Sequence, residues 1–424
     1  MLTKLYRNYI QPIGSFNRDA RLFLWMTVID GVILSGWMLF FNIYILERGF
    51  DREFLGLVNS LPSLAGLILG IPIGHLSDRI GRKPAIAIGI LFASLSMLGQ
   101  ITLTQPVLIA VMAALTGIFN MFLIVSISPL MMKLSDASNR TLLFSLNYGL
   151  QTLAGAVGSL FAGQLPARYG AILNTQADSA VAYQAVLITS VLLGTTALIP
   201  LWKMNEPKTT SLKGTDQTPL MPGNREPGLR SSPTRLIVKL ATPNFLIGIG
   251  AAILIPYMNV FFKDRFAISD WWLGILFSLS SLFIGVGTLL GPRLTSQLGG
   301  KIRTVAFTQF ASIVFLLIVG FWPSVWVAGI ALLMRAALMN MSAPLYTAFC
   351  MEQTPEHQQG LVSSVLNIAW QVGWGVGPYL SGIVQEQYGF APLFVTTTVL
   401  YVAAILLMWV FFQSSEERVV PVAA

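Results

Sequence analysis

The sequence predicts an all-α membrane protein with twelve transmembrane helices, arranged as two similar six-helix bundles. Three observations predict this class: the composition, a series of apolar runs of about 20 residues, and a near-constant offset between matching motifs in the two halves. The 424 residues are 54% hydrophobic and only 10% charged, with a mean hydropathy of +0.70. Soluble proteins carry about 25% charged residues, so the chain is a polytopic membrane protein.

The apolar runs favour helices over a β-barrel, because barrel strands alternate polar and apolar residues over only about 10 positions. Twelve spans are expected, and several are long enough to require tilt. They cover residues 22–47, 54–76, 84–104, 107–132, 140–164, 179–202, 243–263, 271–291, 304–322, 324–350, 360–385 and 391–413.

The distribution of basic residues predicts the orientation. With the N-terminus inside, twenty of the 26 Lys and Arg residues fall in inside segments and five in outside loops, while Arg335 lies within a span. The positive-inside rule therefore predicts that both termini are cytoplasmic in a cell membrane. The net charge of +8 does not indicate nucleic-acid binding, because the basic residues are scattered through short loops.

A polar segment divides the chain into two halves. Residues 203–240 contain five prolines with interspersed Gly, Ser, Thr and charge, a composition typical of a flexible linker. We expect an N-terminal bundle over 1–202, a cytoplasmic linker over 203–240 and a C-terminal bundle over 241–424. The linker is expected to be a covalent tether, with a regulatory role as the alternative.

Motifs recur between these halves. Asn42-Ile-Tyr-Ile-Leu-Glu-Arg48 matches Asn259-Val-Phe-Phe-Lys-Asp-Arg265 at an offset of 217. Asn120-Met121 matches Asn340-Met341 at an offset of 220, and the same offset relates Asn147, Gln151 and Gly155 to Asn367, Gln371 and Gly375. These offsets indicate duplication of a six-helix unit.

A cluster of charge and glycine separates the second and third spans, where we expect a tight aqueous turn, because ionic side chains cannot lie in hydrocarbon. Its members are Gly74, Asp78, Arg79, Gly81, Arg82 and Lys83. Their spacing, G-x-x-x-D-R-x-G-R-K, resembles the signature loop between helices 2 and 3 of the major facilitator superfamily. A merely topogenic loop is the alternative.

The resemblance implies a secondary transporter whose two halves rock about a midplane site. It further implies that helices 1, 4, 7 and 10 line the central cavity, and that helices 2, 5, 8 and 11 form the interface between the halves. Their polar residues are therefore substrate-site candidates: Asn42, Asn120, Asn259 and Asn340. The resemblance also implies that Asp78 meets the start of the eleventh helix near Gly360 and closes the inside gate, with Arg79 and Arg82 in the surrounding charge network.

Asp30 and Arg335 break the internal symmetry, since their repeat counterparts are Ile247 and Leu115. A carboxylate within a span should face the bundle interior or water. Asp30 could take up and release a proton, or act as a structural hydrogen-bonding group. Arg335 could bind an anionic substrate group, pair with Asp30, or be satisfied by helix carbonyls.

The repeated amides Gln151 and Gln371 lie on one helix face with their Asn partners. They are expected to join helices across the two halves, with a substrate contact as the alternative. Aromatic residues crowd the same helices and could stack on a ring-containing substrate, although packing is the commoner use of such side chains. The candidates are Trp37, Tyr257, Trp370 and Trp374, with Phe40 and Phe41.

Two further patterns bear on coupling. Gly373-x-x-x-Gly377-Pro378 is similar to the antiporter motif of the family, but it falls on helix 11 rather than helix 5. Helix 4 lacks the Arg usual in that family, which leaves Asp30 as the main candidate for proton coupling.

Other chemistries are not indicated. The single Cys350 excludes an intramolecular disulfide, and two histidines, His75 and His357, are too few for a metal site. Since the sequence contains no phosphate loop, we expect neither an enzyme nor a cofactor, and the energy should come from an ion gradient.

The predicted function is proton-coupled transport of a small organic solute by a monomer in the lipid bilayer. Export of amphipathic compounds is slightly favoured. The alternatives are a uniporter or symporter for an anionic metabolite and, outside transport, a lipid scramblase or receptor.

Overall fold

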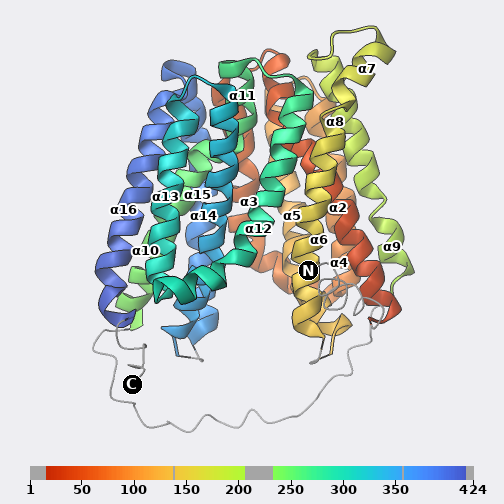
Figure 1. Cartoon of the computed structure of the whole chain (residues 1–424). Helices are drawn as coiled ribbons and strands as arrows, with labels where there is room; N and C mark the ends of the chain where they lie inside the picture. Colours follow the sequence, from red (N-terminus) through yellow and green to blue (C-terminus); the bar gives the residue numbers. More distant parts are fainter. Residues whose placement is uncertain (1–15, 137–138, 206–232, 356–357, 417–424) are drawn as a thin grey trace, which may run out of the picture.

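The computed structural model describes residues 16–136, 139–205, 233–355 and 358–416, and these form helices joined by short turns. Figure 1 shows the helices as two bundles that lie side by side. We call the ends of the helices that the positive-inside rule assigns to the cytoplasm the inner ends, and the opposite ends the outer ends.

Eight helices lie in the described part of the N-terminal half. They are α2 (Arg18–Glu47), α3 (Arg52–Ile80), α4 (Arg82–Thr102), α5 (Pro106–Leu134), α6 (Arg140–Ala162), α7 (Leu165–Leu173), α8 (Ala180–Thr195) and α9 (Leu198–Lys203). The described residues of the C-terminal half form seven α-helices and one 3-10 turn. They are α10 (Pro233–Leu254), η3 (Ile255–Tyr257), α11 (Met258–Phe266), α12 (Asp270–Leu298), α13 (Lys301–Phe321), α14 (Val325–Glu352), α15 (Gln359–Tyr388) and α16 (Ala391–Glu416).

These helices provide the twelve predicted spans. In the described part of the chain, ten are long and apolar enough to cross a membrane, counting α8 with α9 and α10 with α11 as one span each. The helices α6 and α15 complete the twelve. Each of these two helices carries amides and hydroxyls along one face.

The predicted aqueous turn at the signature motif is shorter than expected. Residues 74–80 remain helical as the end of α3, and α4 begins at Arg82, so Gly81 alone forms the turn. Its φ of +96° is open to glycine at little cost. The charged side chains can lie on helical backbone because the ends of α3 and α4 extend beyond the hydrocarbon.

Two other boundaries differ from the predictions. The helix α10 begins at Pro233, so residues 233–240, which were expected in the linker, are helical; proline fits the first turn of a helix, where its missing N–H is not needed. Residues 206–232 of the predicted linker lie outside the described residues. The seventh span is broken at Ile255–Tyr257 because Pro256 cannot donate its backbone hydrogen bond.

The duplicated motifs form the same contacts in each half. Arg48, at the end of α2, donates a hydrogen bond to Leu103 O at the end of α4, at 2.8 Å. Arg265, at the end of α11, donates to Gly320 O of α13 at 2.6 Å. Donors and acceptors are both related by the offset of 217, so these arginines satisfy equivalent helix-end carbonyls.

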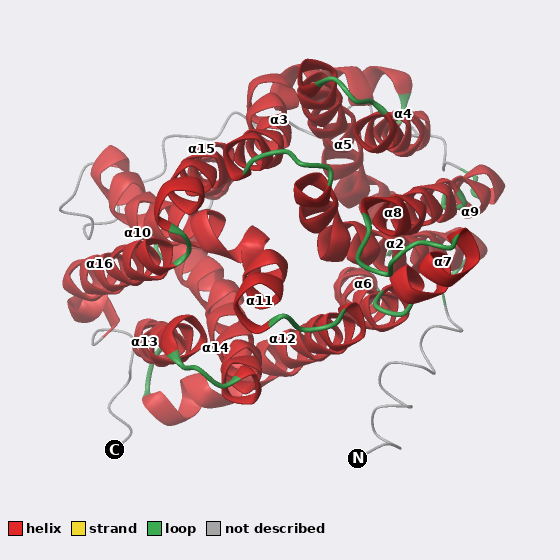
Figure 2. Cartoon of the chain, turned by 90° about the horizontal axis from the view of Figure 1, so that it is seen from above, coloured by secondary structure: helices red, strands yellow, loops and turns green. Residues whose placement is uncertain are grey.

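The two halves meet mainly through α3 against α15 and α6 against α12, as the view in Figure 2 shows. The largest apolar cluster contains residues of both halves near the outer ends, among them Phe40 and Tyr257, and within the C-terminal half it continues to the inner ends, at Leu240 and Phe349. Two smaller clusters lie nearer the inner ends and contain residues of the N-terminal half only. The packing between the halves is therefore concentrated in the outer part of the molecule.

Candidate functional site

The outer ends of the halves are joined by a contact that we call the outer seal. It is formed by α2, α3, α6 and α8 of the N-terminal half with α11, α12 and α15 of the C-terminal half. Glycine allows the closest approaches: a Cβ on Gly56 would lie 2.6 Å from Pro378 O, and one on Gly274 would lie 2.7 Å from Ser159 O. Gly56 and Gly274 are related by an offset of 218, so equivalent glycines of the two halves form these two close approaches.

Two predicted cavity residues, Asn42 and Asn259, lie within this seal and face each other. Asn42 also accepts a hydrogen bond from Asn59 Nδ2 at 3.0 Å. Asn42 and Asn259 are 6% and 1% exposed, so they join the halves rather than line an open site. Tyr257, another predicted site residue, is fully buried and donates to Pro378 O at 2.9 Å.

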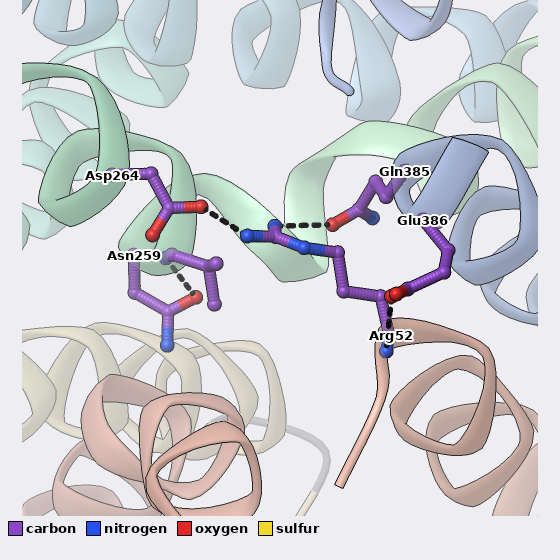
Figure 3. Close-up of polar contacts among 6 residues, drawn as sticks. Arg52, Asn259, Asp264, Gln385 and Glu386 are labelled. Atoms are coloured by element: carbon purple, nitrogen blue, oxygen red, sulfur yellow. Dashed lines mark hydrogen bonds and ion pairs between the residues drawn. The ribbon is translucent and has the colours of Figure 1, made fainter. Parts of the chain in front are cut away.

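Arg52 crosses between the halves at the outer surface. Figure 3 shows its guanidinium between Asp264 of α11 and Gln385 of α15, at 2.7 Å and 3.5 Å. Its backbone N–H donates to Glu386 at 3.0 Å. The ion pair is partly exposed, with 27% of the Arg52 side chain and 41% of the Asp264 side chain accessible.

A second charged group lies deeper in the seal. Lys263 of α11 pairs with Asp270 of α12 at 2.6 Å, and both belong to the C-terminal half. Tyr183 of α8, in the N-terminal half, donates to both carboxylate oxygens of Asp270 at 3.0 and 3.1 Å. Lys263 in turn donates to the Tyr183 hydroxyl at 2.5 Å.

Asp30 lies on a different part of α2, about 18 Å below Asn42 at 1.5 Å per residue. It is exposed, and Gln151 of α6 donates to its Oδ2 at 3.0 Å. The helix packs Gly31 against α6 and Gly36 against α8. Asp30, Leu34 and Met38 follow one another at intervals of four residues on another face, and all three are exposed.

Toward the outer end, the same face of α2 contacts the C-terminal half. One turn beyond Met38 it carries Asn42, which contacts α11, and the Met38 carbonyl itself accepts from Asn259 at 3.3 Å. Trp37, on the adjoining part of the helix, stacks on Phe41 with ring centroids 4.2 Å apart. Below the outer seal, α2 therefore presents an exposed carboxylate and exposed apolar side chains, with the half-buried ring of Trp37 beside them.

The predicted amide contacts between the halves are wrong for the N-terminal set. Asn147 accepts a hydrogen bond from Thr27 Oγ1 at 2.7 Å, and Gln151 binds Asp30, so both amides join α6 to α2 within one half. Their face of α6 turns toward α2 because Gly31 lets the two helices approach closely.

Arg335 lies inside the C-terminal half. It is 5% exposed, its Nη2 donates to Tyr401 Oη of α16 at 3.1 Å, and its Nε has no hydrogen-bond partner among the described residues. The proposed pair with Asp30 is not formed in this conformation, since each residue contacts a neutral side chain of its own half.

The remaining predicted site residues lie on α15, α5 and α14. Trp370 and Trp374 of α15 lie with ring centroids 6.3 Å apart, and Trp370 packs against Gly248 of α10. Gln371 is half-buried on the same helix, and so is Asn120 on α5. Asn340 donates to Ala336 O of its own helix at 2.9 Å.

Among the described residues, the contacts of the signature motif lie within the N-terminal half. Asp78 pairs with Arg82, which also donates to Ser77 Oγ at 3.0 Å. Lys83 donates to Met204 O, at the end of α9, at 2.5 Å. The predicted contact of Asp78 with the start of α15 is thus replaced in this conformation by the pair with Arg82, four residues away on the next helix.

Sequence reasoning did not single out Arg52, Tyr183, Lys263 or Asp270. Arg52 and Lys263 were counted only as basic residues of outside loops. The available signal was the concentration of opposite charges at the outer helix ends, but pairing them requires the arrangement of the halves in space.

Comparison with known proteins gives a consistent result. The family model of the Major Facilitator Superfamily matches residues 24–378 and again 240–423. The multidrug resistance protein MdtG of Proteus mirabilis is 28% identical over 187 residues, covering 42% of this chain and 44% of that protein. A homolog of the multidrug efflux pump PmrA from Lactococcus lactis is 28% identical over 182 residues, covering 41% and 44%. The chain thus matches less than half the length of these relatives.

Solved structures share the fold over nearly the whole chain. A bacterial homolog of the human lysosomal transporter Spinster, inward-facing and occupied, has a TM-score of 0.73 at 13% identity, covering 95% of this chain and 96% of that one. The nucleoside transporter NupG has a TM-score of 0.67 at 14% identity, covering 93% and 98%.

Proposed function

Because the chain belongs to the major facilitator superfamily, we propose that it exports amphipathic organic compounds in exchange for protons, by alternating access of the two halves. The observation that carries this proposal is the exposure of Asp30 on the face of α2 that leads to the C-terminal half. A carboxylate within a membrane span is costly and is retained where it has a role.

The surroundings of Asp30 support both coupling and binding. Asp30 accepts a hydrogen bond from the neutral amide of Gln151, and no ion pair of Asp30 occurs in the described ranges. The carboxylate can therefore exchange a proton without breaking an ion pair. The neighbouring exposed Leu34 and Met38 and the half-buried Trp37 favour a substrate with apolar and aromatic parts.

The sign of the charges favours neutral or cationic substrates over anions. Asp30 would attract a cation, whereas Arg335 is buried against Tyr401 within the C-terminal half and offers no exposed guanidinium. This placement does not support the alternative of an anionic metabolite. The multidrug resistance names of the relatives agree with export.

The position of the outer seal defines the proposed state. The hydrogen bonds and the ion pair between the described parts of the two halves lie near the outer ends, while Asp30 is exposed on the inner side of them. We propose that this is the inward-facing state, in which substrate and protons exchange with the cytoplasm. Separation of the seal would then expose the same face of α2 to the other side.

The test uses the full chain in proteoliposomes with an imposed pH gradient and a fluorescent lipophilic cation. The parent should give saturable transport that depends on the gradient. Asp30→Asn should abolish the gradient dependence, and Asp30→Glu should retain part of it. The control Asp136→Asn, which removes a carboxylate outside the spans, should leave transport unchanged.

Three results would contradict the proposal. Gradient-driven transport that persists in Asp30→Asn would exclude Asp30 as the coupling residue. Selective transport of organic anions would favour the alternative substrate class. Lipid exchange between leaflets without any gradient would indicate a scramblase.

A further inference from the structure

We propose that the hydroxyl of Tyr183 is the main polar contact that holds the outer seal closed, by docking on an ion pair that the C-terminal half forms by itself. We call Tyr183, Lys263 and Asp270 the latch. The inference rests on the proposed function only in requiring that the two halves separate at their outer ends.

The first step is the location of the charges in the latch. Lys263 and Asp270 both belong to the C-terminal half, on α11 and α12, and they pair at 2.6 Å. Separation of the halves leaves this pair intact, so the pair by itself does not resist opening. The hydrogen bonds of the group that cross between the halves are those of the Tyr183 hydroxyl.

The three side chains of the latch are largely buried. Tyr183 is fully buried, and the side chains of Lys263 and Asp270 are 19% and 9% exposed. Hydrogen bonds to charged groups are stronger than those between neutral groups, and low local dielectric strengthens them further. The Tyr183 ring also lies 5.2 Å from the Lys263 ammonium and 5.3 Å from the Phe40 ring, which fixes the hydroxyl over the ion pair.

The positions that the repeat relates to Asp270 and Lys263 carry different residue types. Asp270 is related to Arg52 by the offset of 218 that relates Gly274 to Gly56, and Lys263 is related to Leu46 by 217. The N-terminal half therefore has no matching ion pair at these positions. Arg52 instead reaches Asp264 across the seal, but this pair is partly exposed and is screened by water and salt.

Within the latch, the contribution to the closed seal thus depends on one hydroxyl. Loss of that hydroxyl should favour the state with open outer ends by roughly 10- to 100-fold, the range expected for a hydrogen bond to charged groups. Loss of the Arg52 side chain should change the same equilibrium at most a few-fold.

The experiment measures the distance between the outer ends in the full chain, in lipid nanodiscs and without substrate. Spin labels are placed at Thr104 and Pro323, on the outer loops of the two halves, after replacement of the buried Cys350 by Ala. Tyr183→Phe should increase the long-distance population relative to the parent by at least 10-fold.

The matched control is Tyr169→Phe. Tyr169 shares a hydrogen bond with Thr189 at 2.5 Å, and both residues belong to the N-terminal half. This variant loses a tyrosine hydroxyl next to the same helix without losing a contact across the seal, so its distance distribution should equal that of the parent.

A second variant protects the test against misfolding. If Tyr183→Phe lowers the yield of folded protein, Asp270→Asn weakens the acceptor of the same hydrogen bond and should also raise the long-distance population. Equal distributions in the parent and in a folded Tyr183→Phe or Asp270→Asn variant would overturn the latch. If the outer ends do not separate in any variant, even at saturating substrate, the proposal of alternating access is contradicted as well. This outcome distinguishes failure of the proposed function from failure of the latch alone.

Discussion

Asn42 and Asn259 join the outer ends of the two halves by exchanging equivalent hydrogen bonds. Asn42 Nδ2 donates to Pro256 O at 2.6 Å, and Asn259 Nδ2 donates to Leu39 O at 2.9 Å. The two donors are 217 residues apart in sequence, and so are the two acceptors. The internal repeat is therefore expressed as a pseudo-twofold contact within the seal.

We expect Asn42→Ala and Asn259→Ala to shift the halves toward separation of their outer ends by similar amounts. Each variant removes about 1 kcal/mol of net hydrogen bonding and leaves a buried carbonyl without its donor. The spin-label distance between Thr104 and Pro323 measures the shift. Asn340→Ala, which loses a bond within its own helix, should give the distribution of the parent, and unequal effects of the two seal variants would contradict the pseudo-symmetry.

A side chain at Gly56 should prevent closure of the outer ends. A Cβ there would lie 2.6 Å from Pro378 O, and such overpacking costs about 1–3 kcal/mol. Gly56→Ala should therefore populate the open seal and slow transport, as measured by labelling of a cysteine at Ser60 with a membrane-impermeant reagent. At Gly149 an added Cβ meets nothing within 4 Å, so Gly149→Ala serves as the control. Equal labelling of Ser60 in both variants would show that the close approach does not limit closure.

Arg335 should contribute to the packing of the C-terminal half rather than to substrate selection. Replacement of a buried charge by an apolar group of similar size is often neutral or stabilising. Arg335→Met should keep the substrate Kd of the parent and should leave the thermal midpoint equal or higher. Both quantities can be measured in detergent, with Tyr401→Phe as the variant that removes only the hydroxyl partner. A specific loss of anion binding in Arg335→Met would restore the anion-binding role.

Asp78→Asn should favour the conformation described above and slow transport without impairing folding. The family resemblance implies that Asp78 contacts the start of α15 when the inner ends close, and here it pairs with Arg82 instead. When the inner ends are closed, the Asp78 carboxylate would lie at the N-terminus of α15, where a negative charge is favourable. Asp78→Asn removes that charge and therefore destabilises only the state with closed inner ends. Accessibility of a cysteine at Ser364, on the inner part of α15, should increase. Unchanged accessibility relative to the parent would argue against an inner gate at Asp78.

Much of the architecture follows from local properties of the chain. Apolar runs of about 20 residues must be helical in a bilayer, because every backbone polar group needs a partner within its own segment. The duplication was visible in the Asn42 and Asn259 motifs because both copies keep the residues that make equivalent contacts, such as Arg48 with Leu103 O and Arg265 with Gly320 O. The length of the turn at Gly81 was not predicted correctly. Charged residues indicate that a segment lies in water, but they do not end a helix.

The amino-acid pattern alone specifies the twelve spans, the two related halves and the presence of an acid and a base within them. What each of these groups contacts depends on how the helices pack in three dimensions. Asp30 and Arg335 looked equivalent in sequence as isolated charges in apolar helices, yet one is exposed beside Gln151 and the other is enclosed against Tyr401. The direction of a side chain depends on the rotation of its helix against its neighbours, which packing of residues distant in sequence decides. For the same reason, Tyr183 and Asp270, 87 residues apart, become partners only when the two halves meet.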